Sequence, residues 1–298
     1  MGIEFDPFAQ FQDFAHPEKF VSASWLSARL GTDGLRVVES DEDAFLYDIG
    51  HIPGAVRIDW HRDLNDPTVR DFIDGEAFAK LMNDKGIGRD DTVVVYGDRN
   101  NWWAAYTAWV FELFGHPDVR LLDGGRDAWM GEERDTSYAV PDYPSRNYPV
   151  VERQDKPRRA FVDDVRTRSK NHLLIDARGP EFYAGAEHLT QKEPNCSSPV
   201  QRHGHIPGAV NHPWGASVYP NGRVKDRASI SEAYAHTLAT VDTDNPSIIA
   251  YCSNGQSAAH TCFILRNVLG LEDVALYDGS WVEWGNMIRM PIEREAGL

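Results

Sequence analysis

Cys252 is the residue with the clearest capacity for chemistry. It follows the apolar, β-branched run Ser247-Ile248-Ile249-Ala250-Tyr251 and precedes a short polar loop, after which comes an alanine-rich segment. The run predicts a buried strand and the segment after Ser257 predicts a helix, so the thiol lies at the mouth of a strand-to-helix loop. Loop N–H groups and the positive end of the helix dipole would favour a thiolate there, and a thiolate is a nucleophile. The alternative, a small buried core residue, is the more usual role of a lone cysteine.

The loop after Cys252 carries hydroxyl and amide side chains and no charged ones. Backbone N–H groups in such a loop can hold negative charge on sulfur without a cationic side chain. Gly255 permits the backbone to turn inward where a Cβ could obstruct it. We therefore expect the loop to bind a small anion through these residues: Ser253, Asn254, Gly255, Gln256 and Ser257.

The other two cysteines indicate no disulfide framework and no metal site. Three cysteines are too few for the former, and their spacing matches no zinc pattern. Cys262 falls on the apolar face of the predicted helix and is expected in the core. Cys196, with His203 and His205, has irregular spacing that is more typical of a loop thiol than of a metal site. No metal or cofactor is expected, and a reducing cytoplasm suits this cysteine usage best.

Composition and charge limit the partners. The chain has 298 residues, 42% hydrophobic and 26% charged, which is typical of a globular protein long enough for two domains. A formal charge of −16 argues against nucleic acid and anionic membrane, because both require cationic side chains. The N-terminus lacks the pattern of a signal peptide, and no apolar run approaches the ~20 residues of a membrane span. An anionic ligand would need a local site.

The first half of the chain alternates predicted strands and helices. We expect helices over residues 24–30, 75–84 and 102–114, and strands over 35–39, 92–96 and 119–122. From residue 131 to 160 the sequence is polar and contains four prolines, which indicates a linker. A second pass of the same order begins with a predicted strand at residue 173.

The second pass is an internal repeat. His51-Ile52-Pro53-Gly54-Ala55-Val56 recurs as His205-Ile206-Pro207-Gly208-Ala209-Val210, and residues 92–129 align without a gap with 247–284. Such agreement indicates two copies of one α/β domain. The predicted organisation is a loose leader over 1–18, an inactive domain over 19–140, a linker over 141–159 and a catalytic domain over 160–298.

The copies differ where the chemistry is expected. The position of Cys252 in the second copy is Gly97 in the first. A thiol in only one of two homologous loops predicts one catalytic and one inactive copy. Asp98 and Arg99, in the loop without the thiol, are expected to be solvated charges.

Taken together, these motifs resemble the two-domain rhodanese family of sulfurtransferases. The loop Cys252-Ser253-Asn254-Gly255-Gln256-Ser257 matches that family's six-residue active loop, with the nucleophile first, glycine fourth and a hydroxyl residue last. The turn Asp278-Gly279-Ser280-Trp281-Val282-Glu283-Trp284 matches its C-terminal signature. The resemblance implies two tandem rhodanese-like α/β domains, each a mainly parallel central sheet flanked by helices. It also implies transfer of a sulfane sulfur through a persulfide on Cys252.

The donor and the acceptor stay open. The resemblance implies thiosulfate or 3-mercaptopyruvate as the small anionic donor, and cyanide, a thiol or a protein as the acceptor. Thiosulfate-preferring members usually carry Arg or Lys in the active loop, and this loop is neutral. Phe182 stands where members often place a substrate-binding arginine. Arg178 looks structural, which leaves Arg202 as a possible replacement.

Two further residues are weighed against the family pattern. In mercaptopyruvate-type members the first-domain histidine of the His-Ile-Pro-Gly element is proposed to assist proton transfer across the cleft, which makes His51 a candidate. His205 repeats the element, however, and a repeated histidine favours a structural role in the turn. Trp281 is expected to support the active loop from beneath.

Two alternative functions share the reactive cysteine. A Cys-dependent phosphatase needs a longer loop closed by an arginine, and Ala258 stands at that position. A sulfur-relay protein would accept persulfide from one partner and deliver it to another. Because it passes through the same intermediate, the sequence does not separate it from an enzyme.

Overall fold

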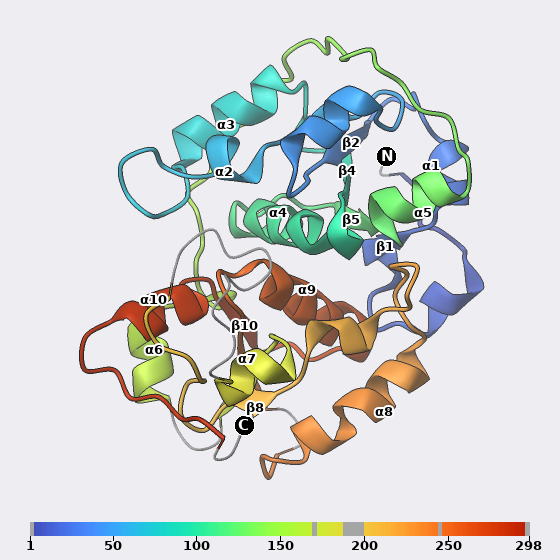
Figure 1. Cartoon of the computed structure of the whole chain (residues 1–298). Coiled ribbons are helices and arrows are strands. Elements are labelled where there is room, and N and C mark those ends of the chain that lie inside the picture. The colour runs from blue at the N-terminus through green and yellow to red at the C-terminus, as the bar shows by residue number, and fades with distance from the viewer. Residues whose placement is uncertain (1–2, 169–171, 187–199, 244–245, 296–298) are drawn as a thin grey trace. The chain divides into compact units, whose positions relative to one another are not determined.

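The computed structural model describes residues 3–168, 172–186, 200–243 and 246–295, so Cys196 lies outside the described residues. The chain divides into two compact units. Unit 1 comprises Met1–Gln154 and Tyr219–Val224, and unit 2 comprises Asp155–Val218 and Lys225–Leu298. Each unit has its own parallel sheet and its own core (Figure 1).

Unit 1 is built on a five-stranded sheet in the order β1-β5-β4-β2-β3, with every pair parallel. The three strands predicted in this half are confirmed as β2, β4 and β5. The two edge strands contain only two residues each, too few for a pattern of alternation to identify them. The strands are β1 (Phe20–Val21), β2 (Leu35–Glu39), β3 (Val56–Arg57), β4 (Thr92–Tyr96) and β5 (Val119–Leu122).

Helices cover both faces of this sheet, as a parallel sheet requires. Trp25 of α1 and Trp129 of α5 belong to the cluster that packs on Val94 and Tyr96, whereas α4 contacts β4 and β5. Almost every residue of α4 is buried, which explains why its sequence is apolar all round. The helices are α1 (Ala23–Ser27), α2 (Trp60–Asp63), α3 (Gly75–Asp84), α4 (Trp102–Leu113) and α5 (Gly125–Gly131), with 3₁₀ turns at Ala9–Asp13, Pro17–Lys19, Ala44–Ile49 and Arg99–Asn101.

The N-terminal leader is anchored to unit 1, so the expectation of a loose segment is wrong. The Asp6 carboxylate accepts hydrogen bonds from both the N–H and the hydroxyl of Ser22, each at 2.6 Å. Phe11 and Phe14 are buried and pack against Phe20, with ring centroids 5.7 and 4.8 Å away. Burial of its aromatic side chains therefore fixes the leader to the sheet.

Unit 2 repeats the topology of unit 1. Its sheet has the order β6-β10-β9-β7-β8, again with every pair parallel. The matching order confirms that the sequence repeat is a repeat of one fold. The strands are β6 (Arg159–Ala160), β7 (His172–Asp176), β8 (Val210–Asn211), β9 (Ser247–Tyr251) and β10 (Val274–Tyr277).

The helix after the Cys252 loop is fully buried. Every residue of α9 is buried, and the helix packs on β9 and β10. Cys262 is 1% exposed and belongs to the core, as predicted. No helix in the described ranges is long and apolar enough to span a bilayer. The helices are α6 (Val162–Thr167), α7 (Pro180–Ala184), α8 (Arg227–Leu238), α9 (Gln256–Ile264) and α10 (Ser280–Asn286), with a 3₁₀ turn at Trp214–Ser217 and a π turn at Leu265–Leu269.

Candidate active site

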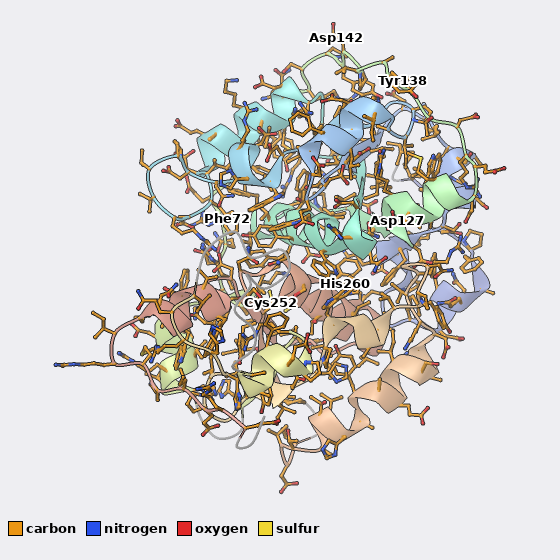
Figure 2. All side chains as sticks on the ribbon, in the orientation of Figure 1. Phe72, Asp127, Tyr138, Asp142, Cys252 and His260 are labelled. Carbon is orange, nitrogen blue, oxygen red and sulfur yellow. The ribbon has the colours of Figure 1, made fainter. Side chains whose placement is uncertain are left out.

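Cys252 lies in the loop between β9 and α9, as predicted, and its side chain is only 1% exposed (Figure 2). Its Sγ accepts a hydrogen bond from the Gly255 N–H at 3.1 Å and lies 3.6 Å from the Gln256 Oε1. Gly255 has a φ of +104°, which strongly favours glycine. The loop therefore curls around the sulfur and directs an N–H donor to it.

The start of α9 adds electrostatic support. The first N–H groups of a helix have no partner within the helix, and the dipole places partial positive charge at the same end. Helix α9 begins at Gln256, four residues after Cys252. A negative charge on sulfur is therefore next to backbone donors and a helix N-terminus, which together can stabilise an anionic nucleophile.

The turn before α10 holds the other side of the loop. The Cys252 carbonyl accepts from the Trp281 N–H at 3.0 Å, and the Ser253 carbonyl accepts from the Val282 N–H at 2.9 Å. The Cys252 N–H donates to the Ser280 Oγ at 3.2 Å. Trp281 therefore supports the loop as expected, through its backbone.

Ser280 contacts the Cys252 backbone, a role that the sequence analysis did not predict. Its φ is +52°, a left-handed conformation that costs a non-glycine residue about 1 kcal/mol or more. Its hydroxyl donates to the Tyr277 carbonyl at 2.7 Å while accepting from Cys252. The equivalent residue of unit 1 is Gly125, with a φ of +57°. A serine aligned with a glycine in the repeat was the available signal.

The two candidate arginines have structural partners in unit 2. Arg178 pairs with Asp176 at 2.5 Å and donates to the Gly204 carbonyl at 2.8 Å, which confirms its predicted structural role. Arg202 donates to four backbone carbonyls near the end of α10, those of Trp284, Gly285, Met287 and Met290. Helix C-termini leave such carbonyls unpaired. This geometry gives Arg202 a capping role and no support for donor binding.

His51 also has structural partners. Its Nδ1 lies 2.9 Å from the Tyr47 carbonyl oxygen, its Nε2 lies 3.1 Å from that of Ala139, and its ring stacks on Tyr47. His205 in unit 2 repeats this arrangement with the carbonyl and ring of Tyr183. The same contacts in both copies favour a histidine that holds its turn.

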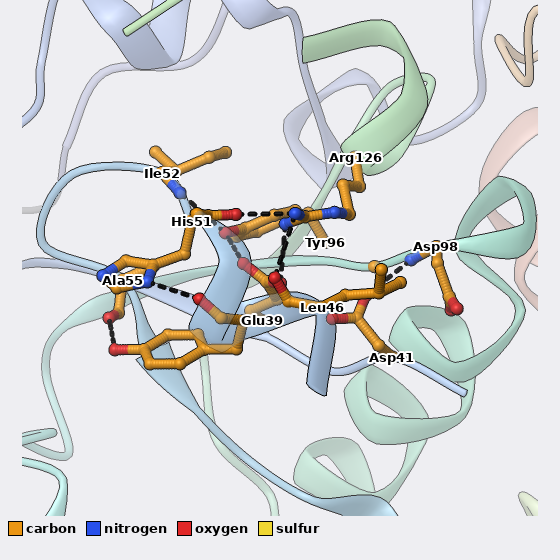
Figure 3. Close-up of polar contacts among 12 residues, drawn as sticks. Glu39, Asp41, Leu46, His51, Ile52, Ala55, Tyr96, Asp98 and Arg126 are labelled. Carbon is orange, nitrogen blue, oxygen red and sulfur yellow. Dashed lines mark hydrogen bonds and ion pairs between the residues drawn. The ribbon is translucent and has the colours of Figure 1, made fainter. Parts of the chain in front are cut away.

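In unit 1 the N–H groups of the equivalent loop are bonded to side chains of the same unit, and Figure 3 shows one of these bonds, from Asp98 to Asp41. A Cβ at Gly97 would lie 2.1 Å from the Ser40 carbonyl oxygen, so no side chain fits there. The Gly97 N–H donates to the Asn101 Oδ1 at 3.0 Å, and the Asp98 N–H donates to the Asp41 Oδ1 at 2.7 Å. These bonds occupy donors that would otherwise be available to an anion.

The acidic groups of this loop are buried, which corrects one expectation. Asp98 is 7% exposed and accepts from the Glu42 N–H at 2.8 Å, so it is not a solvated charge, whereas Arg99 is exposed. Burial, together with the neighbouring Glu39 carboxylate, raises the pKa of Asp41 to about 10. Asp41 is therefore protonated at neutral pH.

Glu39 is the acceptor at the centre of this network (Figure 3). Its carboxylate receives hydrogen bonds from the Tyr96 hydroxyl and, at 2.8 Å, from Arg126. Arg126 also donates to the carbonyls of Leu46 and Gly50. Within the described ranges of both units, no three His, Cys, Asp or Glu side chains are grouped so as to bind a metal ion.

A known protein-family model matches the chain twice, once in each copy of the repeat. The family model described as "Rhodanese-like domain" matches residues 22–132 and again residues 162–287. Each match covers one copy, and the second contains Cys252.

Similar proteins extend over nearly the whole chain. "Thiosulfate sulfurtransferase" of Corynebacterium glutamicum is 61% identical over 296 residues, covering 98% of this chain and 96% of its own. "Sulfur carrier protein TtuD" of Thermus thermophilus is 46% identical over 286 residues, covering 94% and 98%. The crystal structure of YnjE superimposes with a TM-score of 0.78 at 23% identity, covering 95% of this chain and 70% of that one, and supports the fold alone.

Proposed function

This chain belongs to the rhodanese family, and from that premise we propose that it is a thiosulfate sulfurtransferase that carries sulfur as a persulfide on Cys252. The observation behind the proposal is that a thiol with a loop N–H directed at its sulfur occurs in only one of the two equivalent loops, since the other has Gly97 at that position. The C. glutamicum relative, which bears this activity in its name, adds support at 61% identity.

The cycle has two half-reactions. The Cys252 thiolate attacks the outer sulfur of thiosulfate, an S–S bond forms, and sulfite leaves with the electron pair of the bond that breaks. The acceptor then attacks the outer sulfur of the persulfide, and Cys252 leaves as a thiolate. The Gly255 N–H, 3.1 Å from Sγ, stabilises the anion at both ends of the cycle. Covalent catalysis of this kind predicts ping-pong kinetics.

Donor recognition depends on neutral groups. Ser253, Asn254 and Ser257 offer hydroxyls and amides, and the first turn of α9 offers backbone donors. Such a site suits thiosulfate less strongly than a cationic loop would, so 3-mercaptopyruvate is the second donor to test. For acceptors we propose cyanide, a small thiol or a protein thiol. A reducing cytoplasm suits this cycle, because oxidation of Cys252 would remove the nucleophile.

Turnover with each donor tests the proposal. Purified protein is mixed with thiosulfate and cyanide, or with 3-mercaptopyruvate and a thiol, and thiocyanate or pyruvate is measured. We expect Cys252→Ser to reduce turnover by at least about three orders of magnitude, because loss of a nucleophile is among the largest single effects in catalysis. Cys262→Ala, in the core of the same helix, is the matched thiol control and keeps activity. Undiminished turnover by Cys252→Ser would overturn the mechanism.

A sulfur-carrier role is the second candidate, favoured by the 46% identity to a relative named as a sulfur carrier. The carrier passes through the same persulfide but takes it from a protein. Wild-type protein that turns over neither small donor, yet gains 32 Da at Cys252 from a persulfidated protein, would favour this role. A phosphatase is not proposed, because Ala258 stands where the phosphate-binding arginine is required.

A further inference from the structure

Gln256 contacts the reacting atom of the site. It is the first residue of α9, its side chain is 2% exposed, and its Oε1 lies 3.6 Å from the Cys252 Sγ with the sulfur as donor. In this orientation the amide oxygen accepts a hydrogen bond from the thiol S–H.

That orientation suits only one state of the cysteine. A thiolate or a persulfide has no proton to donate, so an amide oxygen facing it would place two acceptors together in a buried position. A glutamine can reverse this contact, because rotation of its terminal amide by about 180° replaces the oxygen with an N–H donor.

We propose that Gln256 is a catalytic residue whose amide reverses as Cys252 changes state, accepting from the thiol and donating to the sulfur anion. When the S–H bond breaks, the proton passes to solvent and the sulfur keeps the electron pair, while the amide stays neutral throughout. The persulfide anion receives the same N–H donor. This last part of the proposal rests on the proposed function.

The equivalent residue of unit 1 shows what the position does without a sulfur. The Asn101 Oδ1 accepts from the Gly97 N–H at 3.0 Å, and its Nδ2 donates to the Leu122 carbonyl at 2.6 Å. Both ends of that amide bond the backbone, so its orientation is fixed. Gln256 is one methylene longer, and its amide oxygen contacts the Cys252 sulfur.

Alkylation of Cys252 by iodoacetamide across pH tests the proposal without any sulfur donor. Gln256→Met has similar length and neither hydrogen-bonding group, and we expect it to move the midpoint of the rate profile upward by about half to one pH unit. Gln256→Glu keeps acceptors only and adds a charge, so we expect an upward shift of about two units. Gln201→Glu, an exposed residue of unit 2, adds the same charge as a control and leaves the profile unchanged.

Two outcomes would overturn the proposal: unchanged profiles for both Gln256 variants, or equal shifts for both, which would indicate packing alone. Should either variant fail to fold, the wild-type protein decides. Its Gln256 side-chain amide resonance, in ¹⁵N-labelled protein, is expected to shift with the same pH midpoint as alkylation, and a resonance that does not move contradicts the reversal. Because neither readout uses a donor, failure of turnover would leave this result intact and count only against the proposed function.

Discussion

The loops after β4 and β9 occupy the same place in two copies of one fold, yet they use their backbone donors differently. In unit 1, Asn101 and Asp41 accept the N–H groups of Gly97 and Asp98. In unit 2, the Cys252 sulfur accepts from Gly255. Unit 1 therefore lacks more than the thiol, because side chains of the unit already accept from its loop N–H groups.

A buried arginine makes the same kind of contacts in both units but comes from a different position in each. In both units a guanidinium binds the acidic residue that ends a central strand, and also the carbonyl of the glycine directly before the histidine of the His-Ile-Pro-Gly element. In unit 2 the guanidinium belongs to Arg178, two residues after Asp176. In unit 1 it belongs to Arg126 on α5, which binds Glu39. By strand register, position 41 of unit 1 matches Arg178 of unit 2. Unit 1 has an aspartic acid there, and its side chain accepts from the Asp98 N–H of the loop.

Transplanting the nucleophile gives the strongest test of this comparison. We expect Gly97→Cys, made in the Cys252→Ser background, to restore no turnover. A Cβ at position 97 would meet the Ser40 carbonyl oxygen at 2.1 Å, and the loop donors are already bonded. The measurement is thiocyanate formation, with mass spectrometry for a persulfide at position 97. Recovered turnover would show that the missing thiol alone inactivates unit 1.

Ser280 allows the two loops to be compared at a second position, on the other side of Cys252. Ser280→Gly installs the residue of unit 1, removing the hydrogen bond to Cys252 and relieving the left-handed strain. The two stability effects are each about 1 kcal/mol and nearly cancel. We expect kcat to fall about ten- to a hundred-fold through misplacement of the sulfur while the melting temperature hardly changes.

Ser280→Ala is the matched control for that prediction. It loses the same hydrogen bond but keeps the strained backbone, so activity falls equally and stability falls by about 1–2 kcal/mol. Activity that follows stability across the two variants, with Ser280→Gly fully active, would mean that the serine serves the fold alone.

Much of this architecture was predictable because short stretches of the sequence carry clear strand and helix patterns. The strand over 92–96 and the strand over 247–251 are continuous apolar runs. Their repeat identified the fold and showed that only one of the two equivalent loops carries a thiol. Cys252 at a strand-to-helix loop followed directly from that pattern.

The remainder depends on distant partners. Arg126 and its acid Glu39 are 87 residues apart, and Asp41 and Asp98 are 57 apart, so no local pattern indicates their burial together. For Ser280 the alignment with Gly125 was a signal, but its contact with Cys252 depends on the fold. Arg202 was a candidate for binding the donor from the sequence, but its guanidinium donates to backbone carbonyls near the end of α10.

The proton on Asp41 offers the finest test of how unit 1 is closed. The pKa of this carboxyl is about 10 in the folded protein and near 3.8 when unfolded, so the folded state holds a proton that the unfolded state loses between those values. Stability then falls as pH rises through that window, by at most about 1.4 kcal/mol per pH unit. Asp41→Asn can accept from Asp98 but cannot ionise, so we expect its stability relative to wild type to grow from pH 6 to pH 8.5. Urea unfolding at both pH values measures the difference, with the exposed Asp127→Asn as control, and parallel behaviour of variant and wild type would mean that Asp41 is ionised in the folded loop.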